Sequence, residues 1–325
     1  MASMKDSQEI IIKEIDGKAI VWFKNSNQYI VLETATASIL NDLLKNISRT
    51  EIASKLASEY EIPIKDAIVF VNDVATKIMT PNLKTIGSEN SEQKISIPKK
   101  PQQTSYYNID GIVFKVEFET EYEHYLIHPK FAHLEVDATT SFNFEYQVFT
   151  QNNVTFLLID SVYIGSWKNK DIHYFQGKFS MQIVQNIHQK EEQEWLGVFH
   201  ASAVSNGKKS MLFLGDSGNG KSTSLALLQA HGFDCLADDF VPIDATNQEV
   251  YSFPSAISIK KNSVPHLLPF YPELENAAEF HFKELNKIVR FLPPKNTKAI
   301  KNLPCKALVF IKYQKDSPLN FKAIS

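Results

Sequence analysis

The sequence contains few of the residues that define several common classes of protein. It has two cysteines among 325 residues, Cys235 and Cys305, and they are too far apart for metal-ligand spacing. It therefore predicts no disulfide framework and no cysteine-ligated metal, and two reduced thiols fit a cytoplasmic protein. Arginine is equally rare, because Arg49 and Arg290 are the only two. Few guanidinium groups are therefore available to clamp a phosphate.

Charge and hydropathy argue against two further classes. The formal net charge is −3, so the chain lacks the excess of lysine and arginine that favours nucleic acid or an anionic membrane. No run of about eighteen apolar residues is present. The N-terminal stretch MASMKDSQEI has no apolar core of the kind found in a signal peptide. We therefore expect a cytoplasmic protein with no nucleic-acid or membrane partner.

The most informative stretch is GDSGNGKST, which runs from Gly215 to Thr223. It matches the phosphate-binding loop pattern G-x-x-x-x-G-K-[ST] in full. Glycines let backbone N–H groups approach phosphate oxygens, and the helix that follows adds its positive end. In this pattern Lys221 contacts the β- and γ-phosphates and Ser222 ligates Mg²⁺. We expect ATP and Mg²⁺ here, with contacts from Gly215, Asp216, Ser217, Gly218, Asn219, Gly220, Lys221, Ser222 and Thr223.

The flanking residues give this loop its expected context. Met211–Leu214 is a short apolar run typical of a buried strand, and a helix is predicted to end near His231-Gly232. Val198–Val204 also alternates, and an Asn-Gly turn separates it from residues 210–214. An antiparallel hairpin is therefore expected to lead into the loop.

A pair of carboxylates follows the same helix. Residues 233–237 read as a strand that ends in Asp238-Asp239. At the carboxyl end of a strand beside a phosphate-binding loop, one carboxylate can hold Mg²⁺ while the other accepts a hydroxyl proton. The alternative is that the pair only terminates the strand.

Residues 8 to about 85 predict a small domain of their own. An Asp16-Gly17 turn joins the first two strands, and the capping box Ser48-x-x-Glu51 opens the second helix. Strands are predicted over 9–15, 19–23 and 29–32, and helices over 36–44, 48–60 and 64–78. Strands followed by three compact helices indicate a winged-helix-like domain.

Part of this segment resembles a known family. The stretch YIVLETATASILNDLLKNISRTEIASKLASEYEI…VFVNDVATKIM is similar to the PqqD-like peptide-recognition domain of ribosomal-peptide modification systems. The resemblance implies that the domain binds the leader of a precursor peptide as an added strand. It places the sheet edge at Tyr29–Leu32 and a helical wall at Val69–Asp73. The same apolar framework could instead serve only as the domain's core or dock another protein.

The middle of the chain carries a linker and then a β-rich region. Residues 88–104 are polar and aperiodic, which is typical of a linker. Between 105 and 194, alternating segments predict an antiparallel sheet and residues 178–194 an amphipathic helix. His124, His128 and His133 do not have the spacing of a metal site, and Pro129 interrupts them. The first two are expected at the surface or a sheet edge.

The C-terminal region resembles a second family. The segments FHASAV, GDSGNGKST and FDCLADDFVPI together are similar to the catalytic domain of the HPr kinase/phosphorylase family and its serine-kinase relatives, over about residues 195–325. The fold of that family is related to phosphoenolpyruvate carboxykinase. The resemblance implies that His200 lies near the active site and that Lys221 and Ser222 serve phosphate and Mg²⁺. Asp238 and Asp239 supply the catalytic base, and Asp238 is also a metal candidate. Because the family is often oligomeric, a homo-oligomer fits this resemblance.

The chain departs from that family at two points. Thr223 stands where the bifunctional enzymes usually carry a glutamate, and no Arg-Gly-rich second signature follows. These departures favour a dedicated kinase over a phosphorylase. Lys260 is a candidate phosphate contact, and Arg290 is the one arginine available there to stabilise a transition state. Either could instead be an ordinary surface cation.

Together these features predict a multidomain α/β (α+β) chain. We expect a winged-helix-like peptide-binding domain over 1–87, a linker over 88–104, a β-rich region over 105–194 and a P-loop kinase domain over 195–325. The expected activity is ATP-dependent phosphorylation of a serine on a ribosomally made precursor peptide. A nucleotide-sensing regulatory or scaffold protein and a kinase of a small molecule such as free serine are the alternatives. The Asp238-Asp239 pair argues against a sensor, which needs no base.

Overall fold

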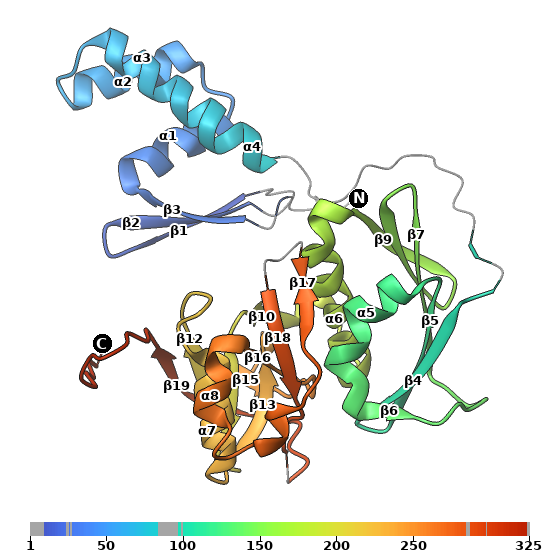
Figure 1. The fold of residues 1–325 in the computed structure, drawn as a ribbon. Helices are drawn as coiled ribbons and strands as arrows, with labels where there is room; N and C mark the ends of the chain where they lie inside the picture. Colours follow the sequence, from blue (N-terminus) through green and yellow to red (C-terminus); the bar gives the residue numbers. More distant parts are fainter. Residues whose placement is uncertain are drawn as a thin grey trace. The chain divides into compact units, whose positions relative to one another are not determined.

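The computed structural model describes residues 10–23, 26, 28–83, 97–98, 100–283, 287–296 and 298–323. The chain divides into two compact units, Met1–Glu92 and Gln93–Ser325. It is a mixed α/β protein with several separate sheets (Figure 1). Most of the predicted linker 88–104 lies outside the described residues, and its last two residues begin a strand. No helix in the described part of the chain is long and apolar enough to cross a membrane.

The first unit combines a three-stranded antiparallel sheet with a helical layer, as the predicted order of strands and helices required. The turn at Asp16-Gly17 has positive φ at both residues, and the Ser48 side chain accepts a hydrogen bond from the Glu51 amide at the start of α2. The predicted third helix continues beyond α3 as a π-helical stretch, Val74–Met79. The other elements are β1 (Ile10–Ile15), β2 (Lys18–Phe23), β3 (Gln28–Glu33), α1 (Thr34–Leu44), α2 (Arg49–Glu59), α3 (Ile64–Asp73) and α4 (Thr80–Leu83).

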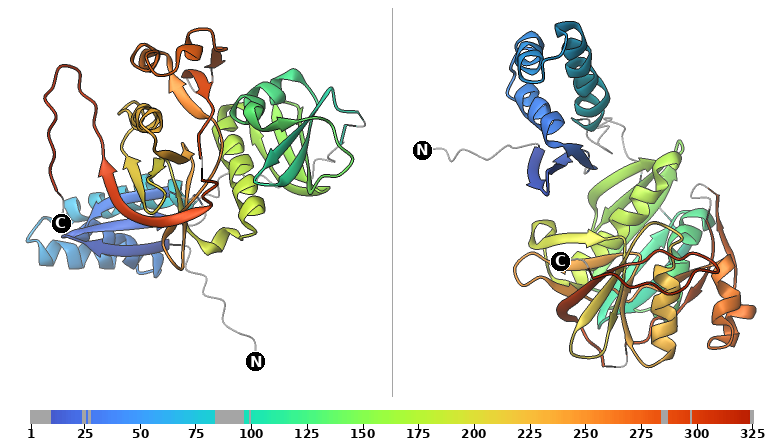
Figure 2. Two further views of the ribbon diagram at one scale, coloured as in Figure 1. Left: turned by 90° about the horizontal axis from the view of Figure 1, so that it is seen from below. Right: turned by 90° about the vertical axis from the view of Figure 1, so that its left-hand side faces the viewer.

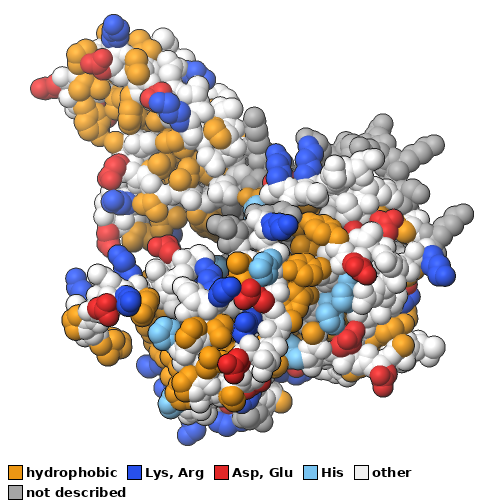
Figure 3. All heavy atoms as spheres, viewed as in Figure 1, with side chains coloured by type: hydrophobic (Ala, Val, Ile, Leu, Met, Phe, Trp, Pro, Cys, Tyr) orange, Lys and Arg blue, Asp and Glu red, His pale blue; other side chains and the backbone are white. Residues whose placement is uncertain are grey.

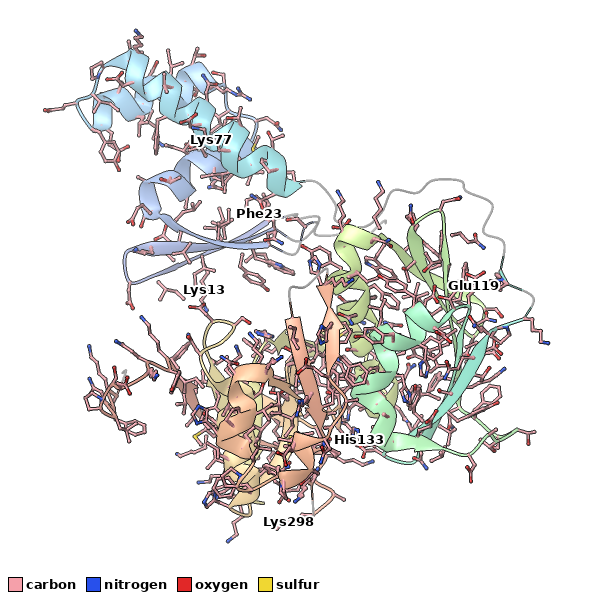
Figure 4. The ribbon with its side chains drawn as sticks, viewed as in Figure 1. Lys13, Phe23, Lys77, Glu119, His133 and Lys298 are labelled. Carbon is pink, nitrogen blue, oxygen red and sulfur yellow. The ribbon has the colours of Figure 1, made fainter. Side chains whose placement is uncertain are left out.

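Burial in this unit follows the two-residue period of its strands. Ala19, Val21 and Phe23 of β2 are fully buried in one core with the helices, while Lys13 of β1 is exposed. Figure 4 shows Phe23 on the side of the helices and Lys13 on the opposite face of the sheet. The sheet therefore packs through one face only within this unit.

The second unit begins with a six-stranded sheet in the order β6-β4-β5-β7-β8-β9. Its β5 and β7 strands are parallel, which corrects the prediction of an antiparallel middle region. A parallel pair needs a crossover connection, and the helix α5 (Glu121–Phe131) lies in it. This helix was not predicted, although Thr120 and Glu123 form a capping box at its start. The strands are β4 (Gln103–Ile109), β5 (Ile112–Phe118), β6 (Glu135–Val136), β7 (Phe144–Gln151), β8 (Val154–Ile159) and β9 (Val162–Lys168).

The three histidines of this region pack rather than gather at a metal. His124 and His128 were expected at the surface or a sheet edge, but they are half-buried on α5, and their rings stack with centroids 4.3 Å apart. Burial lowers the pKa of both rings. His133 contacts the Pro254 carbonyl oxygen at 3.0 Å, where the middle region meets the C-terminal part of the unit (Figure 4). The described residues contain no group of three or more His, Cys, Asp or Glu side chains placed to hold a metal ion.

The glycine-rich loop belongs to a seven-stranded sheet in the order β10-β14-β15-β19-β12-β11-β13. Its strands are β10 (Trp195–Phe199), β11 (Ser202–Ser205), β12 (Ser210–Leu214), β13 (Asp234–Asp238), β14 (Val241–Asp244), β15 (Glu249–Tyr251) and β19 (Asn302–Phe310). A three-stranded sheet packs against it, with β16 (Ile257–Lys260), β17 (Phe280–Phe282) and β18 (Lys287–Leu292). The helices are α7 (Lys221–Ala230) and α8 (Val264–Leu267).

Helix α6 (Ile172–His188) joins these sheets into one unit. It begins six residues before the start of the predicted helix 178–194 and ends six residues before the predicted end. Phe175, Phe179 and Ile183 of α6 lie in one buried cluster with residues of both large sheets. Figure 2 shows α6 between the six-stranded sheet and the C-terminal strands. Residues 105–194 and the C-terminal region therefore share a core, and α5 and α6 are fixed beside the candidate site.

Candidate active site

Three motifs from the sequence meet at one edge of the seven-stranded sheet. β11 lies between β12 and β13 and is antiparallel to both, so β12 and β13 run in the same direction. Their carboxyl ends therefore lie at the same edge as the start of β11. The glycine-rich loop follows β12, the Asp238-Asp239 pair ends β13, and His200 precedes β11. The predicted order of strand, loop and helix is confirmed. The predicted hairpin is confirmed over β11 and β12, but the predicted strand 198–204 is broken at residues 200–201, and residues 198–199 belong to β10, which pairs with β14.

Three glycines of the loop, Gly215, Gly218 and Gly220, have the positive φ that favours glycine. Gly215 has φ of 143°, and a Cβ atom there would lie 2.5 Å from the Ile311 carbonyl oxygen. Because that neighbour is backbone, it cannot move aside as a flexible side chain could. Gly220 has φ of 94° and caps the N-terminus of α7. The loop therefore closes tightly against the segment after β19 and directs the start of α7 toward the site.

Lys221 is the first residue of α7 and lies over the loop. Its ammonium group donates hydrogen bonds to the carbonyl oxygens of Gly215 at 2.7 Å and Asp216 at 3.1 Å. Burial lowers the pKa of Lys221, while the nearby charges of Asp238 and Asp239 oppose this shift. A partly desolvated ammonium at this position can contact phosphate oxygens, as the motif predicts.

The remaining loop residues form a second set of contacts. The Asn219 amide donates to the Asp216 carbonyl oxygen at 3.2 Å, which closes the turn that contains Gly218. Lys260 donates to the Ser217 hydroxyl at 2.9 Å, so this predicted cation does reach the loop. Thr223 donates to Ser263 Oγ at 3.0 Å.

Asp238 is held rigidly below the loop. Asp238 is buried, with an exposed fraction of 1%. Its Oδ1 accepts hydrogen bonds from Ser222 Oγ at 2.9 Å and from Ser202 Oγ at 2.5 Å. Oδ2 accepts from the Ser258 amide at 3.1 Å. Burial, together with the charge of Asp239, raises the pKa of Asp238. A bound cation would relieve both effects.

The donor set at this point fits Mg²⁺. Ser222 Oγ and Asp238 Oδ1 converge, and hydroxyl and carboxylate oxygens are hard ligands. Magnesium sites on nucleotides usually take one or two protein oxygens and complete the octahedron with phosphates and water. Ser222 and Asp238 would supply that protein share.

Asp239 faces the opposite way and is surrounded by cations. Its φ of 67° turns the chain at the end of β13, so neighbouring carboxylates reach different surroundings. Oδ1 lies 2.9 Å from His200 Nδ1, and Oδ2 lies 3.3 Å from Lys130 Nζ and 3.9 Å from Lys287 Nζ. Burial alone would raise the pKa of Asp239, but Lys130, His200 and Lys287 outweigh it and hold the pKa well below its usual range. Asp239 therefore stays ionised.

Two cavities adjoin at these residues. The smaller, of about 80 Å³, is lined by the loop, Lys260 and both aspartates. The larger, of about 290 Å³, extends from the same point toward α5 and α6. His200, Asp239 and Lys287 line both cavities. A molecule in the larger cavity and a phosphate on the loop would therefore meet at Asp239.

Arg290 does not reach this site, which corrects its expected role. Lys287 and Arg290 are three residues apart on β18, so their side chains lie on opposite faces of the strand. The Arg290 guanidinium donates to the carbonyl oxygens of Leu274 and Glu275 and pairs with Glu279 at 3.7 Å. Arg290 thus ties β18 to the segment that precedes β17.

Three residues of the site were missed by sequence reasoning. Lys130 and Lys287 belong to no motif and lie 109 residues before and 48 residues after Asp239, so no local pattern links them to it. Ser202 could have been found, because it lies two residues after His200 in the same FHASAV segment, and alternation over the predicted strand 198–204 would place both side chains on one side. Its hydroxyl then falls beside the carboxylate pair.

The ion cluster at Asp239 predicts a measurable change on removal of one cation. Lys130→Met keeps the length of the side chain and removes its charge, so the pKa of Asp239 should rise. NMR titration of ¹³C-labelled aspartate carboxyl groups should show Asp239 protonating at higher pH in the variant than in the natural protein. Lys170→Met, an exposed lysine on another segment, serves as the control. An unchanged Asp239 titration in Lys130→Met would contradict the proposed electrostatics.

Neither a comparison with models of known protein families nor a search of curated proteins finds a match for this chain.

Proposed function

We propose that the chain is an ATP-dependent phosphotransferase that phosphorylates a serine hydroxyl of a peptide. The observation that carries this proposal is the position of Asp239, which lines both the loop cavity and the larger cavity beside it. A carboxylate at such a junction can bind an acceptor hydroxyl while the γ-phosphate lies on the loop. A nucleotide sensor would need the loop cavity alone.

In this proposal the acceptor oxygen attacks the γ-phosphorus of ATP. The bond between that phosphorus and the β,γ-bridging oxygen breaks, ADP leaves, and the hydroxyl proton passes to Asp239 and then to solvent. The low pKa of Asp239 makes it a weak base, but the transition state of phosphoryl transfer is loose and demands orientation more than early proton removal. An ionised carboxylate fixed by His200 and Lys130 suits that task.

The charge that develops on the phosphoryl oxygens would be stabilised by lysines. Lys221 and Lys260 lie at the loop, and Lys287 lines both cavities. Burial lowers the pKa of Lys287, with Asp239 acting in the opposite sense. Ammonium groups held in a partly desolvated site stabilise a spreading negative charge more strongly than they would in water. Lys287 takes the place that the sequence suggested for Arg290.

Mg²⁺ would be held by Ser222 and Asp238. When bound, it neutralises charge on the β- and γ-phosphates and supplies Lewis-acid stabilisation. Ser202 and the Ser258 amide keep the Asp238 carboxylate in position for this role. The two aspartates thus receive different tasks, with Asp238 for the metal and Asp239 for the acceptor.

The first unit supports recruitment of the peptide. Within the described strands of this unit, β3 pairs with β2 only, so its other edge can accept an added strand. Tyr29 and Val31 on β3 are 65% and 61% exposed. Of the predicted wall 69–73, Val69 and Phe70 are exposed and Val71 is buried. Figure 3 shows hydrophobic side chains gathered on the surface of this unit.

Recruitment by a separate unit would change what the site must do. A peptide held by its leader is presented at a high effective concentration, so the acceptor residues need only bind weakly. The larger cavity, of about 290 Å³, has room for an acceptor residue and a neighbouring side chain, so the remainder of a peptide substrate would be held elsewhere. This supports a precursor peptide as the substrate.

Substitution of Asp239 and Lys221 tests whether these residues serve phosphoryl transfer. Transfer from γ-labelled ATP to candidate precursor peptides should fall by about 10²- to 10⁴-fold in Asp239→Asn, which keeps the shape and loses the charge. ATP binding should persist in that variant and fall in Lys221→Ala. Asp160→Asn, at a turn of the six-stranded sheet, is the matched control. ATP binding by the natural protein with no transfer to any acceptor would favour a nucleotide sensor.

Lys287 and Arg290 allow a direct comparison of two cations on one strand. Lys287→Met should lower kcat for transfer by about 10²-fold, because it removes a charge beside the phosphoryl group. Arg290→Met should leave kcat within about twofold and lower the melting temperature, because it loses the contacts to residues 274, 275 and 279. Rate and thermal-melt measurements on both variants decide the assignment, which is wrong if Arg290→Met loses transfer and Lys287→Met does not.

A carboxylate placed on the exposed part of the predicted helical wall 69–73 tests whether this surface of the first unit binds the peptide. Val69→Asp should raise KM for a candidate precursor peptide by about tenfold or more, because it places a carboxylate on an apolar contact surface. The core peptide without its leader should not distinguish the variant from the natural protein. Ser58→Asp, exposed on another helix of the unit, is the control. Equal KM values for the leader-bearing peptide in all three proteins would exclude this surface.

A further inference from the structure

The larger cavity has walls that a simple hydroxyl acceptor would not use. Its apolar lining comes from several elements that converge on Asp239: Leu126 of α5, Val198 of β10, Phe240 after β13, Phe282 of β17 and Phe291 of β18. A free amino acid such as serine carries polar groups on almost every atom and would gain little from these aliphatic and aromatic side chains.

The polar groups that line the cavity are largely engaged with the protein itself. Gln176 Nε2 donates to the Leu126 carbonyl oxygen at 2.8 Å, and Ser180 Oγ donates to the Gln176 carbonyl oxygen at 2.9 Å. Lys130 and Lys287 both face Asp239. The charged groups thus lie around Asp239, where this cavity adjoins the loop cavity, and the rest of the wall, apart from His173, offers mainly apolar contact.

Gly177 is a second, independent observation. It lies inside α6, a 17-residue helix, where a glycine costs about 1 kcal/mol relative to alanine. Its backbone does not have the positive φ that favours glycine, and an added Cβ would have no neighbouring atom within 4 Å. Neither the backbone conformation nor a lack of space for a side chain therefore explains why residue 177 is a glycine. Gly177 lines the cavity, and the missing side chain leaves that space open.

We propose that this cavity binds an apolar side chain next to the acceptor hydroxyl. The substrate is then a peptide in which the phosphorylated serine neighbours a residue of the size of leucine or phenylalanine. A volume of about 290 Å³ holds such a side chain with part of its backbone. This inference rests on the proposed phosphotransferase function and narrows its substrate class.

The expected preference follows from the burial of one side chain. Moving a leucine or phenylalanine side chain from water into an apolar pocket supports a discrimination of about 10- to 100-fold over glycine. Most of that preference should appear in kcat/KM for short peptides, because no leader is present to raise their effective concentration.

The experiment uses the full chain, ATP and two sets of four synthetic peptides. Each peptide has one serine, and the residue before it is phenylalanine, leucine, glycine or aspartate; a second set places the variable residue after the serine. In at least one set, phenylalanine and leucine should exceed glycine and aspartate in kcat/KM by about 10- to 100-fold. The ratio of the phenylalanine peptide to the glycine peptide is the readout, because it does not depend on the fraction of active protein.

Gly177→Leu fills the cavity and should reduce that ratio to about one. Gly177→Ala adds only a methyl group and favours the helix, so it should retain most of the preference. Transfer to every peptide at equal rates in both sets would overturn the apolar-neighbour inference and leave the phosphotransferase proposal standing. A preference unchanged in Gly177→Leu would also overturn it. No transfer to any of these peptides, while a leader-bearing precursor peptide is phosphorylated, would overturn the apolar-neighbour inference alone. No transfer to either kind of peptide, with ATP bound, would overturn the phosphotransferase proposal and the substrate class together.

Discussion

The site depends on a single turn of the backbone at the end of β13. Because Asp239 has a positive φ, two adjacent carboxylates have opposite environments: Asp238 is sealed among hydroxyl and amide donors, and Asp239 lies among cations at the mouth of a cavity. Two neighbouring carboxylates in one environment would repel each other and share a proton. The turn separates them, so their pKa values shift in opposite directions. Each can then serve a different partner.

The order of the strands makes this turn useful. An antiparallel strand, β11, lies between β12 and β13, and α7 connects these two strands, so the loop and the carboxylates lie at the same edge of the sheet. Ser202, the first residue of β11, reaches Asp238, and His200, two residues before β11, reaches Asp239, so this short stretch supplies a partner to each carboxylate. Local sequence patterns therefore translate directly into site geometry in this part of the chain.

This explains which parts could be predicted from the sequence. The glycine loop, the hairpin before it and the Asp238-Asp239 pair are contiguous patterns, and the positions of β12, α7 and β13 follow from them. The α5 helix was missed because it has almost no amphipathic pattern over its length and contains Pro129, although its capping box was readable. Lys130 and Lys287 were missed because contacts between distant segments leave no periodic signal. Arg290 was wrongly assigned to the site because the prediction considered how few arginines the chain has and did not consider which face of the strand its side chain occupies.

The ion pair between Lys130 and Asp239 has a consequence for the modularity of the chain. Lys130 belongs to α5, and α5 and α6 provide a wall of the larger cavity. Residues 195–325 contain the glycine-rich loop and the Asp238-Asp239 pair, but Lys130 and the wall formed by α5 and α6 lie outside that range. A segment that began at residue 195 would therefore lose part of the surroundings of Asp239. The first unit, by contrast, has a core of its own.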